Sequence, residues 1–147
     1  MLTKLKIMNF RSIADQEIEI GPLTILYGPN ASGKSSVFYA LNAFRNIVLN
    51  PNQIADGFFN LGFANLGKYE QVVHNHRPDA EITFAVEGSA GPSGVRYAVT
   101  FGKQAARFAL YLGEPHEVNL DLAVTFPYPT NAEAIIALSV DQQTVNL

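Results

Sequence analysis

The sequence predicts an α/β domain in which antiparallel strands surround one helix. Three patterns predict it: a glycine-rich loop at residues 28–35, a helical stripe behind that loop, and apolar–polar alternation within residues 80–126. The chain has 147 residues, of which 48% are hydrophobic and 16% charged, so one domain with a buried core is expected over residues 1–147. It contains no cysteine, which excludes disulfides and thiolate metal sites.

Residues 1–50 are expected to form a unit of strands, a loop and a helix. Leu5 and Ile7 alternate with lysines, and Ile18 and Ile20 alternate with glutamates, so two half-buried strands are predicted. The run LTILY, residues 23–27, is continuously apolar, as is typical of a strand covered on both faces. A helix follows and ends at Asn50-Pro51; its predicted apolar stripe is Val37, Leu41, Phe44 and Val48, with Phe38 beside it.

Residues 80–126 predict an antiparallel β meander. Four stretches alternate apolar residues with polar or small neighbours, and the turn sequences GSAGPSG, GKQA and GEPHE separate them. Short connections between such strands favour antiparallel pairing. The tail allows two interpretations: Thr130 and Glu133 would form a capping box for a helix AEAIIALSV, whereas IIALSV would also serve as a strand.

The stretch GPNASGKS, residues 28–35, matches the pattern G-x-x-x-x-G-K-[ST] in full. Gly28 and Gly33 allow backbone N–H groups to approach phosphate oxygens, and the following helix adds the positive end of its dipole. Lys34 would reach the β- and γ-phosphates of a nucleotide, and the Ser35 hydroxyl would bind Mg²⁺. The motif therefore predicts a P-loop that binds a nucleotide.

The charge is distributed unevenly along the chain, whose net charge is −3. Residues 1–50 carry five Lys and Arg against three Asp and Glu, and the remainder carries five against ten. The acidic remainder argues against a broad nucleic-acid footprint. The N-terminus lacks a signal-peptide layout and no apolar run approaches the ~18 residues of a membrane helix, so we expect a cytoplasmic protein without membrane contact.

Residues 5–44 resemble the N-terminus of the SMC/RecF-like ABC ATPases, which include the OLD-type nuclease ATPases. The elements that carry the resemblance are Asn9-Phe10-Arg11-Ser12 and GPNASGKS, preceded by β-like chain. The resemblance implies the first lobe of an ABC-type P-loop NTPase head, with ATP and Mg²⁺ as cofactors. The residues it implies around the nucleotide are Arg11, Asn30, Ala31, Ser32, Gly33, Lys34, Ser35 and Ser36, with Lys34 also catalytic and Ser12 a weaker candidate.

The resemblance also implies a Gln-loop residue that touches Mg²⁺ or the attacking water. The segment YEQVVHNHRPDAEITF stands before a predicted strand and offers His74 as the counterpart, with Gln71 in reserve. The alternative is a polar loop that faces solvent. His74 and His76 lack an evident third ligand, so a metal site there is not expected.

Hydrolysis also needs a carboxylate that holds Mg²⁺ and a group that orients water. IIALSVDQ resembles a Walker B strand ending in Asp141, but Gln142 stands where the catalytic Glu belongs, and no Ser-Gly-Gly signature occurs. We therefore expect the N-terminal fragment of a larger ATPase head, which its remaining lobe completes. The resemblance implies an ATP-bridged homodimer and work on DNA, as in DNA repair, or on a partner nuclease. Two alternatives stay open: a small P-loop phosphotransferase and a non-catalytic nucleotide sensor.

Overall fold

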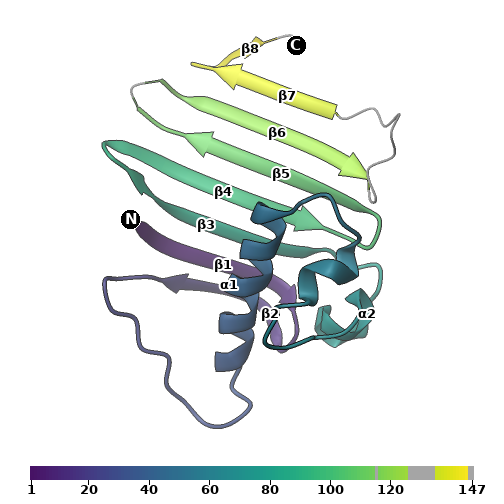
Figure 1. Ribbon diagram of the computed structural model, residues 1–147. Helices are drawn as coiled ribbons and strands as arrows, with labels where there is room; N and C mark the ends of the chain where they lie inside the picture. Colours follow the sequence, from purple (N-terminus) through teal and green to yellow (C-terminus); the bar gives the residue numbers. More distant parts are fainter. Residues whose placement is uncertain (115, 126–134, 146–147) are drawn as a thin grey trace.

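The computed structural model describes residues 1–114, 116–125 and 135–145, which form one antiparallel sheet in the order β2-β1-β3-β4-β5-β6-β7-β8 (Figure 1). The strands are β1 (Leu2–Phe10), β2 (Ile13–Glu19), β3 (Ile82–Ala90), β4 (Ser93–Phe101), β5 (Ala105–Leu112), β6 (Val118–Thr125), β7 (Ile135–Val140) and β8 (Gln143–Val145). The helical elements are α1 (Lys34–Leu49), η1 (Ala55–Phe59), α2 (Tyr69–Val72) and η2 (His74–His76), where η denotes a 3₁₀ turn.

Strand β1 joins the N-terminal hairpin to the meander. It pairs with β2 on one side and with β3 on the other, with Leu5 opposite Ile18 and Val86. The alternation at Leu5 and Ile7 and the strands of the meander are therefore confirmed. Beyond the predicted range the meander continues through β7 and β8, so residues 1–50 and the meander share one sheet.

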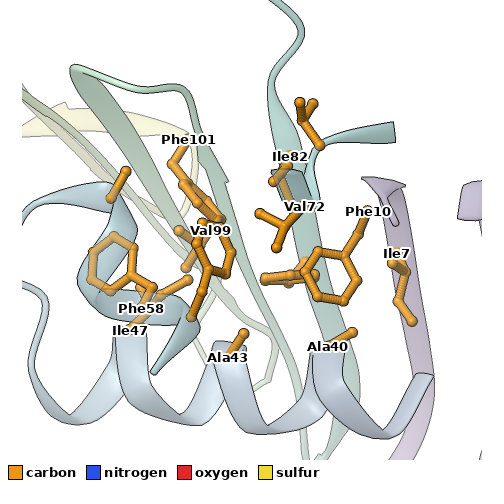
Figure 2. Packing of buried hydrophobic residues seen from close by; sticks show 14 of the residues in the cluster. Ile7, Phe10, Ala40, Ala43, Ile47, Phe58, Val72, Ile82, Val99 and Phe101 are labelled. Atoms are coloured by element: carbon orange, nitrogen blue, oxygen red, sulfur yellow. The ribbon is translucent and has the colours of Figure 1, made fainter. Parts of the chain in front are cut away.

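Helix α1 packs on one face of the sheet through small side chains. Ala40, Ala43 and Ile47 are fully buried against sheet residues (Figure 2). The predicted stripe was wrong by one position, because Val37, Leu41 and Phe44 are only half-buried at its flank and Val48 is 47% exposed. Alanines at the contact let the helix backbone approach the sheet, and the larger side chains then fill the space beside it.

Aromatic side chains fill the core between the sheet and the short helical elements. Phe101 lies at its centre, with ring centroids 5.6 Å from Phe58, 5.9 Å from Phe84 and 6.2 Å from Tyr69. The Tyr69 hydroxyl shares its one proton between the carbonyls of Ala80, at 2.5 Å, and Phe101, at 3.2 Å. Tyr69 therefore ties α2 to the sheet, directly before the segment that carries His74.

Replacing Tyr69 by phenylalanine is expected to lower the free energy of unfolding by about 1–2 kcal/mol near pH 8, because two carbonyls lose their donor. Burial raises the pKa of Tyr69 from 10.0 to about 12. The folded state thus favours the neutral phenol, and this part of the stability is complete below about pH 10 and disappears as the pH rises towards 12. Urea unfolding of both proteins at about pH 8 and 11 checks this, since the variant loses less stability than the parent over that interval. Equal losses in both proteins would contradict the assignment.

The segment LTILY does not form the strand that its composition predicts. Residues 24–28 carry no regular structure, and Leu23, Ile25 and Tyr27 are 80%, 71% and 91% exposed. Figure 1 shows this stretch as an irregular connection between the end of β2 and the start of α1. A strand requires a neighbour for its backbone groups, and none of the described residues pairs with this segment. The predicted strand at the P-loop was therefore wrong for this chain.

The tail forms a strand rather than a helix, and it is not a Walker B strand. Residues 135–140 are β7, which lies antiparallel to β6 at the end of the sheet away from α1 (Figure 1), so of the two interpretations left open for this tail the strand IIALSV is confirmed. Asp141 lies in the turn to β8, where the Glu117 N–H at 2.9 Å and His116 Nδ1 at 3.0 Å lower the pKa of its carboxyl. Its carboxylate stabilises that turn instead of facing a phosphate. Thr130 and Glu133 lie outside the described residues.

Candidate nucleotide-binding site

The glycine-rich loop has the backbone conformation that its glycines predict. Gly28, Ala31 and Gly33 have φ values of 144°, 65° and 92°, and α1 begins directly after Gly33. A Cβ on Gly33 would lie 3.3 Å from Ser12 Oγ, and one on Gly28 would lie 3.1 Å from Ser32 Oγ. Both positions therefore suit glycine for conformation and for space, and the loop delivers the chain to the N-terminus of a 16-residue helix.

The Lys34 ammonium lies over this loop. Its Nζ donates hydrogen bonds to the carbonyls of Gly28, at 2.8 Å, and Pro29, at 2.6 Å, and to Ser32 Oγ at 3.3 Å. All three acceptors are neutral. A phosphate oxygen is a charged and therefore stronger acceptor. We therefore expect Lys34 to exchange these partners for a phosphate bound in the loop.

A cavity of about 650 Å³ opens between the loop and the short helical elements α2 and η2. Lys34, Arg11 and the first residues of α1 line it, and none of the described residues that line it is acidic. Such a combination attracts anions. The lining consists of Arg11, Ser12, Asn30, Ala31, Ser32, Gly33, Lys34, Ser35, Ser36, Gln71, Val73, His74, Asn75 and His76.

The two serines of the first helical turn lie differently. Ser35 is exposed at the cavity, whereas Ser36 is buried and shares a hydrogen bond of 3.1 Å with Ser12 Oγ. Ser36 thus fastens α1 to the turn between β1 and β2. Among the hydroxyls of this turn, the one at Ser35 is the more accessible to a metal–phosphate group.

His74 reaches the cavity from the segment after α2 and contacts Arg11. Its Nδ1 lies 2.8 Å from the Arg11 carbonyl oxygen, which only accepts, so Nδ1 carries the proton. In the tautomer that carries its proton on Nδ1, the lone pair lies on Nε2. Gln71 also lines the cavity, but its Oε1 accepts the Lys68 N–H at 2.8 Å and so caps α2. The structure therefore brings His74, Gln71 and the predicted P-loop residues around one cavity.

The profile of a family described as "AAA ATPase domain" matches residues 1–85, which is more than half of the chain. The chain belongs to this AAA ATPase domain family. The match covers the P-loop, α1 and the segment that carries His74, which are the parts that surround the cavity.

The chain is also similar to a known protein. It is 32% identical over 89 residues to an OLD nuclease of Thermus scotoductus, strain ATCC 700910 / SA-01. That match covers 58% of this chain and 16% of the nuclease, so the chain corresponds to a small part of that protein. Together the two findings confirm the resemblance of this chain to the N-terminal region of OLD/SMC-like P-loop ATPases.

The residues of this ATPase domain fit a magnesium–nucleoside triphosphate. The cavity supplies backbone donors, two cations and an accessible hydroxyl at Ser35, while a Mg²⁺ ion keeps further oxygen ligands from phosphate and water. Within residues 1–114, 116–125 and 135–145, no group of three or more His, Asp or Glu is placed to hold a metal by itself.

In that same part of the chain, no helix has the length and apolarity required to cross a bilayer.

Tyr39 and Asn75 are among the residues at the site that were not predicted from the sequence. The Arg11 guanidinium lies over the Tyr39 ring, 5.1 Å from its centroid, and Asn75 lines the cavity with a left-handed φ of 55°. Tyr39 follows Ser35 by four positions, so helical spacing would have placed both side chains on one face of α1. No comparable signal in the sequence marks Asn75.

Proposed function

We propose that this chain binds ATP with Mg²⁺ in its P-loop and is the ATP-binding part of a larger ATPase head. The observation that carries the proposal is the cavity at the N-terminus of α1, which combines Lys34, Arg11 and a glycine-rich loop without an acidic lining residue among the described residues. Such a site attracts the several negative charges of a triphosphate.

Most of the predicted residues have a role in this proposal. Asn30, Ala31, Ser32 and Gly33 present backbone N–H groups to the phosphates, and Lys34 binds their outer oxygens. Ser35 holds Mg²⁺, which neutralises charge on the phosphates when it is bound. His74 orients water through Nε2, since Nδ1 is already engaged by Arg11.

We further propose that a second lobe completes the head. The exposed apolar segment at residues 23–27 supports this, because a strand laid beside it would bury Leu23, Ile25 and Tyr27. A second apolar surface points the same way. Leu110, Leu120 and Leu138 form one row across β5, β6 and β7, on the face that carries α1, and none of the described helices lies over β6–β8 (Figure 1). The added lobe would supply the carboxylate that hydrolysis needs.

Two such heads would then enclose ATP between them, and hydrolysis would separate them. The matched relative is named as a nuclease, and on that basis we propose that the ATPase cycle acts on DNA or on a nuclease partner.

Isothermal titration of the chain with ATP, ADP and GTP, with and without Mg²⁺, followed by a phosphate-release assay, tests the proposal. Mg²⁺-dependent binding of ATP without sustained release of phosphate is the expected result. Multiple turnover by the chain alone would contradict the need for a second lobe. Absence of nucleotide binding at millimolar concentration would overturn the proposed function as a whole.

A further inference from the structure

Arg11 is fixed through its backbone at the edge of the cavity. It lies in the turn between β1 and β2 with a left-handed φ of 53°. Its N–H donates to the Val72 carbonyl at 2.6 Å, and its own carbonyl accepts the His74 Nδ1–H at 2.8 Å. Residues 72–74 thus hold this turn through both the N–H and the carbonyl of Arg11.

The Arg11 side chain rests on an aromatic surface. The Tyr39 ring lies 5.1 Å from the guanidinium carbon, within the range of a cation–π contact, and Phe63 stacks near Tyr39 at 6.4 Å with 28° between the rings. Among the described residues, no carboxylate forms a salt bridge with Arg11. Its charge therefore remains available to an anion in the cavity.

The position of Arg11 next to Ser12 places it near the triphosphate end of the site. Ser12 Oγ lies 3.1 Å from Ser36 Oγ, and Ser36 directly follows Ser35, the residue expected to hold Mg²⁺. The glycine loop and the Arg11–Ser12 turn therefore form two walls of the same cavity. A triphosphate held by the loop and Lys34 would then have its outermost phosphate in the same cavity that Arg11 lines.

We infer that Tyr39 is a positioning residue that holds the Arg11 guanidinium ready for the terminal phosphate, so that the site prefers ATP over ADP. This rests on the proposed function. An arginine already held against a ring loses less rotamer freedom when it binds a phosphate. Tyr39 would thus strengthen binding of the triphosphate without touching it.

The test measures the affinities of the 147-residue chain for Mg²⁺–ATP and Mg²⁺–ADP by titration calorimetry. Tyr39→Leu removes the ring and is expected to weaken ATP binding about three- to tenfold while changing ADP binding less than about twofold. Tyr39→Phe keeps the ring and is expected to retain both affinities within about twofold. Circular dichroism establishes that each variant is folded, and Tyr39→Gln replaces Tyr39→Leu if the latter does not fold.

A double-mutant cycle with Arg11→Ala shows whether Tyr39 acts through Arg11. Arg11→Ala with Tyr39→Leu is expected to bind ATP no more weakly than Arg11→Ala alone. Additive losses, or equal losses for ATP and ADP in Tyr39→Leu, would overturn the inference while leaving ATP binding by the P-loop intact. A parent chain that binds no ATP would instead overturn the proposed function and, with it, this inference.

Discussion

Replacing Lys34 by alanine is expected to weaken ATP binding about ten- to hundredfold, because hydrogen bonds to charged groups contribute about 1.5–3 kcal/mol. In the structure the ammonium donates to two loop carbonyls and one hydroxyl, all neutral. Binding exchanges these partners for phosphate oxygens, so the variant loses the stronger interaction. Titration calorimetry with Mg²⁺–ATP measures the loss.

Arg45→Ala is the matched control, since Arg45 is exposed on the same helix and its removal changes the charge equally. Its ATP affinity is expected to stay within about twofold of the parent. The thermal midpoint of Lys34→Ala should change little, because all three hydrogen bonds of the ammonium are exposed. If Lys34→Ala and Arg45→Ala lowered affinity equally, the contribution of Lys34 would be general electrostatic attraction, and the assignment of the P-loop would fail.

The P-loop could be predicted from sequence because its requirements are local. Gly33 adopts a φ of 92° and abuts Ser12, so the glycine follows from backbone geometry at that position. The strands of the meander could be predicted equally well, because each alternates apolar and polar residues with period two. Both signals depend on residues that lie close together in the chain.

The parts that sequence did not predict correctly depend on neighbours in space. Leu23–Tyr27 has the composition of a buried strand, but no described residue pairs with it, so its side chains stay exposed. The buried side of α1 was misassigned because alanines at positions 40 and 43 carry little hydrophobic signal, although they permit the closest approach to the sheet. The contact between Arg11 and Tyr39 joins a turn to a helix, and neither segment alone indicates it.

Replacing Phe101 by alanine is expected to lower the free energy of unfolding by about 3–5 kcal/mol. Phe101 is fully buried, and its ring lies near Phe58, Phe59, Tyr69 and Phe84. Removal of the ring leaves a cavity among rigid aromatic neighbours that cannot collapse to fill it. The loss is large against the roughly 5–15 kcal/mol by which domains are stable, so the variant should unfold at a much lower urea concentration with a similar slope.

Phe38→Ala removes the same side chain from an exposed position of α1, where Phe38 is 54% exposed. This change is expected to lower the free energy of unfolding by less than about 1 kcal/mol. Comparing Phe101→Ala with Phe38→Ala therefore separates the effect of burial from the effect of losing a phenylalanine. Phe101 supports Tyr69 in α2, five residues before His74, but Phe101 itself does not line the nucleotide cavity. Phe101→Ala should therefore keep its ATP affinity within about twofold where it remains folded. Similar costs for the two variants would mean that the aromatic cluster does not hold α2 on the sheet.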